Sequence, residues 1–259
     1  MATIQASFAN AAEFFNSLLD RLGNIYSYRV GSEQFEQHSF PKLPNQVEDY
    51  LKTGASVDGK RFRAYDVEYL NLSKMLAVSH EYFDIQLQST RLAVSIIPID
   101  DAGRPVGKWE TVFLGDPEPN GPNENGAGRL AEEAVDKIHL SIGDYKIESP
   151  KVSQDPKSSF GKIIEIDLKT KATRVQSLGH RNPEGLLRTK SGALFSTEHG
   201  PKAETSLTWL LTEAITVGRM FLWGLTMQAT ALLRTVSQET IPATRCPRLP
   251  GFLQSGCRI

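Results

Sequence analysis

The sequence has little cysteine and almost no net charge. Its 259 residues include two cysteines, too few for a disulfide framework. The 29 Lys and Arg residues nearly balance the 30 Asp and Glu residues, which gives a formal net charge of -1. This balance argues against a nucleic-acid-binding protein, because such proteins neutralise phosphates with an excess of basic residues.

No apolar run is both long enough and uncharged enough to cross a membrane. The longest candidate, residues 207–233, has Glu213 and Arg219 in its middle, and such charges argue against a transmembrane helix. The N-terminus also lacks the basic start and the long apolar segment of a usual secretory signal.

The first residues instead predict an amphipathic helix. Apolar residues recur there at helical spacing, at Ile4, Phe8, Ala11, Phe15, Leu18, Leu19 and Leu22. Gly23 follows and can end the helix. We expect this helix to pack on the core, and binding to a partner is the alternative.

The middle of the chain is typical of short strands separated by turns. The apolar runs are Ile25–Val30, Ala64–Tyr69, Met75–Ser79, Arg91–Ile97, Trp109–Phe113, Lys137–Gly143, Gly161–Leu168, Ala172–Ser177 and Ala193–Thr197. Strands and helices do not alternate, so a Rossmann-type nucleotide domain is disfavoured. Many evenly spaced strands indicate an all-β sandwich, barrel or propeller.

The strands also group loosely into units of the length of propeller blades. These units are roughly 20–60, 61–108, 109–178 and 179 onward, and a blade spans about 40 to 50 residues. Periodicity alone leaves a sandwich nearly as well supported as a propeller.

One block of the sequence is distinctive. It reads GHRNPEGLLRTKSGALFSTEHGP (Gly179–Pro201), and three weaker motifs precede it in order: GAGRL (Gly126–Leu130), IHLSIGD (Ile138–Asp144) and QDPKSSFGKIIEIDL (Gln154–Leu168). From about Tyr65 to Pro201 the chain therefore resembles the glucose/sorbosone dehydrogenase family.

This resemblance implies a fold and an activity. It implies an incomplete six-bladed β-propeller of about four blades, covering residues 1–201. Family members use pyrroloquinoline quinone (PQQ) and Ca2+ to oxidise the C1 hydroxyl of aldose sugars to lactones. They usually work in the periplasm or outside the cell.

The resemblance also implies site residues. Arg181 and Asn182 match the residues that hold the quinone oxygens, and a guanidinium there would stabilise negative charge as hydride arrives. The carbonyls of Gly200 and Pro201 match calcium ligands, in keeping with the preference of Ca2+ for oxygen. Without the resemblance, Gly200 and Pro201 would be interpreted as a turn that ends a strand.

The expected catalytic base is missing. Family members place a His a few residues before the Gly-Arg-Leu motif, where this chain has Asn125, and no His lies between His80 and His139. A neutral amide cannot act as a general base, although the neighbouring Glu124 could replace it chemically. We therefore expect an inactive or impaired enzyme, and a non-catalytic propeller that binds carbohydrate or protein is the alternative.

The tail, residues 202–259, differs in composition from the rest. It holds six basic residues, three Glu, no Asp and both cysteines, so it carries +3 while residues 1–201 carry -4. Codons that fit this tail, read two nucleotides later, allow GGDELN and then NYGWP, which the family has at this place. We therefore expect a frameshift after about Pro201. A real amphipathic helix, with Leu207, Leu210 and Val217 at helical spacing, is the rival interpretation.

Overall fold

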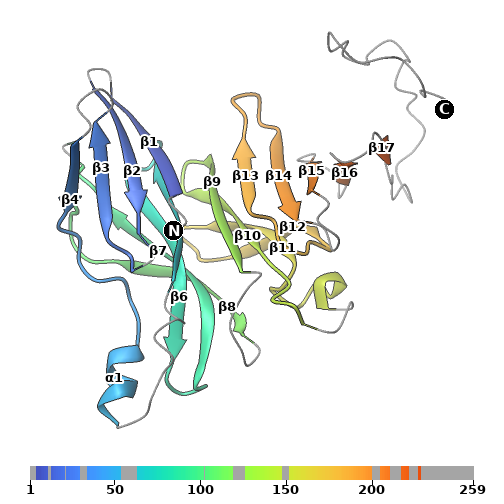
Figure 1. Cartoon of the computed structure of the whole chain (residues 1–259), viewed down its shortest axis with the longest axis horizontal. Helices are drawn as coiled ribbons and strands as arrows, with labels where there is room; N and C mark the ends of the chain where they lie inside the picture. Colours follow the sequence, from blue (N-terminus) through green and yellow to red (C-terminus); the bar gives the residue numbers. More distant parts are fainter. Residues whose placement is uncertain are drawn as a thin grey trace.

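The computed structural model describes residues 4–10, 13–20, 22–29, 34–53, 63–101, 103–118, 126–147, 152–199, 205–210, 217–221 and 227–228. Strands dominate these ranges, where the α-helix is the short α1 (Val47–Lys52) and a 3-10 turn, η1, spans Val152–Gln154 (Figure 1). No helix in the described part of the chain is long and apolar enough to cross a membrane.

The strands form four antiparallel sheets, each built from consecutive strands. Sheet 1 contains β1 (Ile4–Asn10), β2 (Glu13–Leu19), β3 (Ile25–Arg29) and β4 (Gln34–His38). Sheet 2 contains β5 (Ala64–Leu70), β6 (Met75–Asp84), β7 (Ser89–Pro98) and β8 (Glu110–Pro117). Sheet 3 contains β9 (Ala127–Ala134), β10 (Lys137–Ile142), β11 (Lys162–Asp167) and β12 (Thr173–Leu178). Sheet 4 contains β13 (Gly185–Arg188), β14 (Leu194–His199), β15 (Thr205–Leu210), β16 (Val217–Phe221) and β17 (Met227–Gln228).

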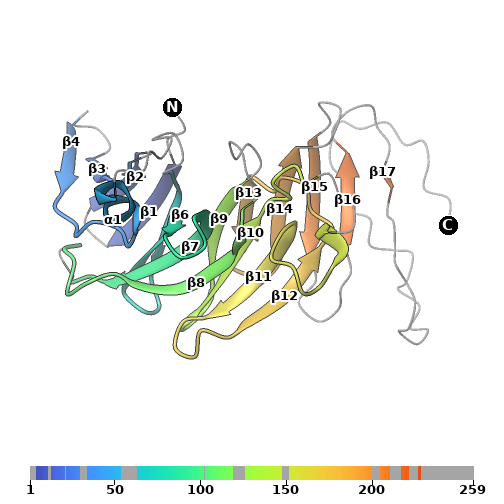
Figure 2. The same cartoon turned by 90° about the horizontal axis from the view of Figure 1, so that it is seen from below.

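The sheets are arranged as the blades of a β-propeller. The first strand of each sheet lies beside the first strand of the next, so that β1, β5, β9 and β13 follow one another. Figure 2 shows the sheets succeeding each other in sequence order. Successive antiparallel sheets whose first strands lie side by side define a propeller. The prediction of an incomplete, all-β propeller is therefore confirmed, and the sandwich alternative is not.

An apolar cluster fills each space between neighbouring sheets. Sheets 1 and 2 enclose one cluster, in Leu19, Ile25, Val67, Leu76, Val78, Ile97 and Ile99. Sheets 2 and 3 enclose the largest cluster, which includes Leu92, Val94, Ile138, Leu140 and Ile164. A small cluster of Ala131, Ile163 and Leu194 joins sheets 3 and 4. The burial of these apolar side chains is what holds successive blades together.

The expected N-terminal helix is wrong. Ile4–Asn10 and Glu13–Leu19 are two paired strands that extend sheet 1 from Ile25–Arg29. Leu19 pairs with Ile25 across β2 and β3, and both residues are at most 2% exposed. Both belong to the apolar cluster between sheets 1 and 2. Pairing with β3 and burial between two sheets outweigh the local helical spacing, which is a weak preference when tertiary packing decides.

The rival helix in the tail is also wrong for the residues that the structure describes. Thr205–Leu210 is a strand that pairs with β14, and Val217–Phe221 pairs with it in turn. The tail therefore continues sheet 4 over these segments. The boundary at Pro201 between a native body and an out-of-frame tail stays a prediction.

One edge of the propeller gathers the loops that matter for the site. Because consecutive strands are antiparallel, the second loop of each sheet opens at the same edge as the connections between sheets. We call this the loop edge. Its loops touch one another: the amide N–H of Ser159 donates to Asp116 Oδ2 at 2.7 Å, and that of Gly179 donates to the carbonyl of Ser153 at 2.8 Å.

Candidate functional site

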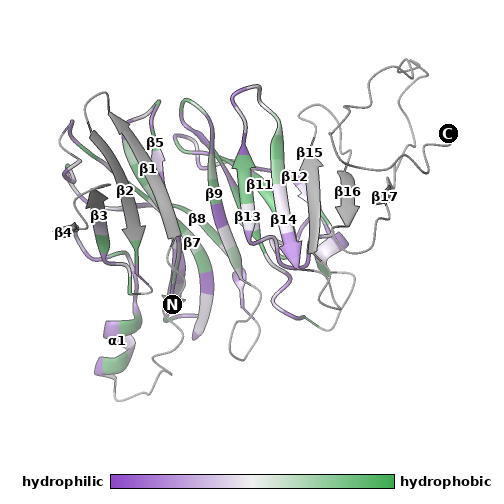
Figure 3. Ribbon diagram, turned by 45° about the horizontal axis from the view of Figure 1, so that its top comes forward, coloured by the Kyte–Doolittle hydropathy of each residue, from purple (hydrophilic) through white to green (hydrophobic). Residues whose placement is uncertain are grey.

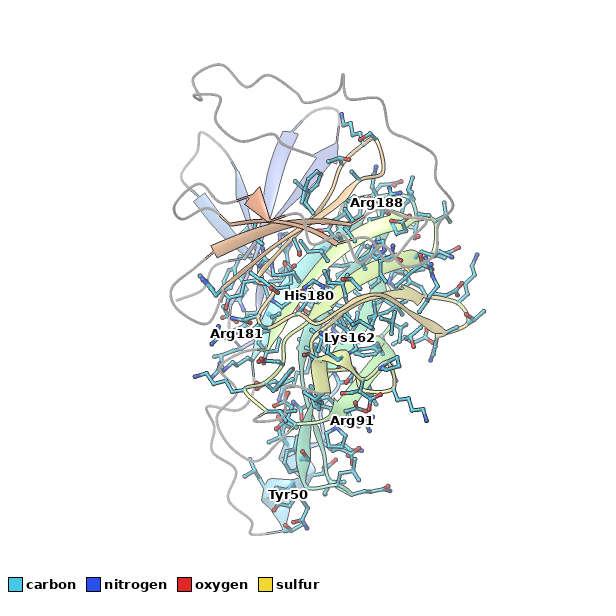
Figure 4. The ribbon with its side chains drawn as sticks, turned by 90° about the vertical axis from the view of Figure 1, so that its right-hand side faces the viewer. Tyr50, Arg91, Lys162, His180, Arg181 and Arg188 are labelled. Atoms are coloured by element: carbon cyan, nitrogen blue, oxygen red, sulfur yellow. The ribbon has the colours of Figure 1, made fainter. Side chains whose placement is uncertain are left out.

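The distinctive sequence block forms one loop and one strand end at the loop edge. Residues 179–184 connect β12 to β13, and β14 ends at His199 beside them. Figure 3 shows that β14 changes from hydrophobic at its start to hydrophilic at its end. Figure 4 shows His180, Arg181 and Lys162 in one part of the molecule, away from Tyr50 of α1. The polar residues of the motif thus meet at the edge where the apolar strands end.

The start of this loop is fixed by the long loop between β10 and β11. The amide N–H of Gly179 donates to the Ser153 carbonyl at 2.8 Å, and that of His180 donates to the Gly161 carbonyl at 3.1 Å. Gly161 has a φ of +65°, and a Cβ there would come 2.6 Å from the His180 carbonyl oxygen. Glycine is required at this close approach of two backbones.

The rest of the loop is fixed by neighbouring loops and by β14. The amide N–H of Asp144 donates to the Arg181 carbonyl at 2.8 Å, and that of His199 donates to the Asn182 carbonyl at 3.3 Å. Ser141 Oγ donates to the Pro183 carbonyl at 2.8 Å. Hydrogen bonds therefore hold the loop at every residue from 179 to 183, which leaves its side chains on a preorganised backbone.

A buried polar trio lies beneath the loop. His180 Nε2 is 2.8 Å from Ser177 Oγ, and His180 Nδ1 is 3.2 Å from Glu198 Oε2. The same carboxylate oxygen accepts the amide N–H of Arg181 at 3.3 Å. A serine, a histidine and a carboxylate in contact are the elements of a hydrolase triad. Here Ser177 is 1% exposed and His180 is fully buried, so the trio has no access to substrate and instead positions the loop.

Two side chains of the loop, Arg181 and Asn182, are the site residues expected from the resemblance. Arg181 is partly exposed, and its Nη1 donates to the His199 carbonyl at 3.1 Å. Asn182 is 4% exposed, and its Nδ2 donates to Glu184 Oε1 at 2.7 Å. Asn182 Oδ1 is buried without a hydrogen-bond partner among the described residues. A buried polar atom without a partner is costly, and consecutive cationic and amide groups suit an oxygen-rich, polar ligand.

The other predicted site residues lie outside the described residues. These are Asn125, Gly200 and Pro201, together with Glu124. Across the ranges that the structure describes, no group of three His, Cys, Asp or Glu side chains could hold a metal ion. The calcium ligands expected from the sequence are backbone carbonyls, so this finding does not bear on them.

Three of the described histidines are buried and closed to a substrate. His80, His139 and His180 are each 1% exposed or less. Burial lowers the pKa of His80 to about 4, and burial also lowers the pKa of His139, which lies 3.2 Å from Glu133 Oε2. These side chains are structural, as expected for His139. His199 is exposed and lies 3.3 Å from Glu184 Oε2.

The GAGRL motif serves the packing of sheet 3 against sheet 2. Gly128 has a φ of +86°, and a Cβ there would meet Tyr65 at 2.7 Å. Ser79 Oγ donates to the Gly128 carbonyl. The Leu130 amide N–H donates to Asp66 Oδ2 at 2.8 Å, and Arg129 Nε lies 3.5 Å from the same oxygen. The inner strands of the two sheets are thus joined by side chains as well as by apolar packing.

Sequence reasoning missed Glu198 and Lys162 as parts of the site. Side chains of a strand alternate between its two faces. Glu198 therefore shares a face of β14 with the buried Leu194 and Ser196, and this spacing was a signal that Glu198 is buried. Lys162 is fully buried. A lysine at the start of an apolar strand carries no such signal, because long basic side chains usually reach solvent.

The fold and the site define a class of protein: an antiparallel propeller segment with a preorganised polar loop at one edge. Residues 69–213 match the family model described as glucose/sorbosone dehydrogenase. The match covers more than half of the chain, and the chain belongs to this family.

Solved structures agree on the fold. The soluble aldose sugar dehydrogenase from Escherichia coli, in the apo-form, is 18% identical with a TM-score of 0.61, and the match covers 83% of this chain and 61% of that one. The PQQ-bound form of aldose sugar dehydrogenase from Streptomyces coelicolor is 20% identical with a TM-score of 0.60, over 82% of this chain and 60% of that one. The chain thus spans about three fifths of the length of these structures. No curated protein matches it.

Proposed function

We propose that the chain carries the quinone-binding part of a PQQ-dependent aldose sugar dehydrogenase, with Arg181 and Asn182 as the residues that hold the quinone end. Arg181 and Asn182 are adjacent on a loop whose backbone is hydrogen-bonded at every residue from 179 to 183, and this preorganised pair is the observation that carries the proposal. Family membership and the PQQ-bound form of the Streptomyces coelicolor relative support it. The carbonyls of Gly200 and Pro201 are proposed as ligands of Ca2+, which takes oxygen ligands.

The residues present suit that role chemically. When bound, PQQ would supply the two-electron acceptor for the hydride at C1 of an aldose, whose C1 hydroxyl loses a proton as the lactone forms. Arg181 would donate hydrogen bonds to a quinone oxygen and stabilise the negative charge that develops on it. Asn182 Nδ2 has two N–H donors. One donates to Glu184 Oε1, and the other would donate to a quinone oxygen.

We further propose that sugar oxidation by this chain is impaired. The position where family members have the base is Asn125, and an amide cannot accept the C1 hydroxyl proton. General base catalysis contributes roughly 10²–10⁴-fold to a rate, so its loss would lower turnover by about that factor. Glu124 is the neighbouring carboxylate that could replace the base.

The tail gives a second reason for impairment. We propose that residues 202–259 are read out of frame, because the alternative frame allows GGDELN and NYGWP in family order. The family's remaining cofactor contacts, basic and aromatic residues of later blades, would then be lost. Sequencing the gene around the Lys202 codon tests this, and codons that do not allow those strings in the shifted frame would refute it. We also propose a periplasmic or secreted location, as the family resemblance implies.

The activity is tested with the purified chain, PQQ, Ca2+, glucose and a dye acceptor. We expect very slow dye reduction, and a rise of about 10²-fold in Asn125→His, because the substitution restores a base. A second variant, Glu124→Gln, removes the neighbouring carboxylate and tests whether Glu124 replaces the base. Fast turnover by the unaltered chain would contradict the impairment, and a large loss in Glu124→Gln would identify Glu124 as the base. Saturable sugar binding without PQQ binding would favour a non-catalytic carbohydrate-binding propeller.

A further inference from the structure

The largest fully buried side chain in the described part of the protein is a lysine. Lys162 begins β11 and is 0% exposed. Its Nζ donates to three backbone carbonyls, those of Val152 at 3.2 Å, Ser153 at 2.8 Å and Phe160 at 2.6 Å. An ammonium has three N–H donors, so all of them are used within one loop. Burial lowers the pKa of Lys162, and the three carbonyl dipoles compensate for the lost water.

Lys162 binds carbonyls of the β10–β11 loop. This loop also holds residues 179–184, which we call the motif loop. The Ser153 carbonyl accepts both Lys162 Nζ and the amide N–H of Gly179, each at 2.8 Å. Lys162 Nζ also bonds to the Phe160 carbonyl, and the next carbonyl, that of Gly161, accepts the amide N–H of His180 at 3.1 Å. One ammonium group therefore fixes the acceptors for two successive amides.

The start of the β10–β11 loop is hydrogen-bonded to Arg181. The Gly161 amide N–H donates to the Gly143 carbonyl at 2.9 Å, which closes the loop on itself, and the Asp144 amide N–H donates to the Arg181 carbonyl at 2.8 Å. Near the two ends of this loop, the rings of Tyr145 and Phe160 pack together with centroids 5.0 Å apart, in the apolar cluster between sheets 2 and 3. Displacing one part of this closed loop would move its other contacts.

We propose that Lys162 is a positioning residue for the motif loop: its ammonium sets the β10–β11 loop, and through the Ser153 and Gly161 carbonyls it sets the backbone that carries Arg181 and Asn182. The part of this proposal that concerns a cofactor rests on the proposed function. The positioning itself does not, because it is a property of the chain without ligand.

The test uses Lys162→Met, which keeps an unbranched side chain only one atom shorter and removes the three donors. The matched control is Lys137→Met in the same sheet, because Lys137 is 42% exposed and pairs with Glu165 at 3.1 Å. Hydrogen exchange is measured without cofactor for the amides of Gly179 and His180, and for the amide of Val94 in sheet 2 as an internal reference. Lys162→Gln, which can still donate two hydrogen bonds, is measured in its place if Lys162→Met does not fold.

We expect exchange at Gly179 and His180 to become at least about tenfold faster in Lys162→Met, with the Val94 amide unchanged and no effect of Lys137→Met, because the amides lose fixed acceptors. Unchanged exchange at Gly179 and His180 would overturn the proposal, and so would an equal rise at Val94, since that would be a general loss of stability. A second readout is the PQQ affinity, which should fall in Lys162→Met. If the unaltered chain binds no PQQ, the proposed function fails while the exchange result still decides the positioning role.

Discussion

Glu68 gives the sharpest test of the way in which neighbouring blades pack. It lies on β5, the inner strand of sheet 2, and its carboxylate accepts a hydrogen bond from the backbone N–H of Glu132 on β9. Burial and the neighbouring Asp66 carboxylate raise the pKa of Glu68 to about 8. Burial also raises the pKa of Asp66 to about 6. Glu68 is therefore neutral at pH 6 in the folded protein and ionised in the unfolded chain.

The direction of the pH dependence follows from this difference. A carboxyl group with a raised folded-state pKa stabilises the fold at pH values below its unfolded pKa of 4.5, and that stability is lost as the pH rises through about 8. Each unit of pKa difference corresponds to about 1.4 kcal/mol. A shift from 4.5 to about 8 therefore corresponds to a loss on the order of 5 kcal/mol between pH 4 and pH 9.

Glu68→Gln removes the charge at nearly constant shape. We expect this variant to have nearly the stability of the unaltered chain at pH 4 and to be several kcal/mol more stable at pH 9, measured by urea unfolding with both free energies extrapolated to water. The control is Glu110→Gln, because the Glu110 side chain is 58% exposed and its variant should differ by less than about 0.5 kcal/mol at either pH. Equal pH dependence in Glu68→Gln and the unaltered chain would refute the burial of this carboxylate between sheets 2 and 3.

Two further substitutions test the loop that carries the motif. Glu198→Leu should lower the free energy of unfolding by about 3 kcal/mol in a urea titration, because His180 Nδ1 and the Arg181 amide lose their shared acceptor; a loss below about 1 kcal/mol would contradict the role given to Glu198. Gly161→Ala should cost at least about 2 kcal/mol, since strain at positive φ adds to a clash with the His180 carbonyl. Gly192→Ala is its control: Gly192 also has a positive φ, but its nearest neighbour is 3.5 Å away, so about 1 kcal/mol is expected.

Much of the fold could be predicted from the sequence because the central strands are apolar and bounded by turns. The runs at Met75–Ser79, Arg91–Ile97 and Gly161–Leu168 lie within or around observed strands. Strands without that signal were missed. Ala127–Ala134 is rich in Ala and Glu, which favour helices, and it is a strand because it pairs with β10 and packs against β5.

Only the site residues that lie within the sequence motif could be predicted. The motif drew attention to Arg181 and Asn182, and the structure describes both on a loop whose backbone is fully bonded. Lys162 could not be predicted, because its role depends on carbonyls that are brought together only when the β10–β11 loop folds. A single sequence does not reveal which backbone acceptors will surround a side chain.

The most direct test of the proposed function is the affinity of the purified chain for PQQ in the presence of Ca2+, compared with Arg181→Met. Arg174→Met is the matched control, because Arg174 is exposed on the same propeller and pairs with Glu165. We predict saturable binding that Arg181→Met weakens by about 10- to 100-fold, since a charge-assisted hydrogen bond contributes about 1.5–3 kcal/mol, while Arg174→Met binds as the unaltered chain does. No saturable binding, or equal affinity in Arg181→Met, would contradict the proposal.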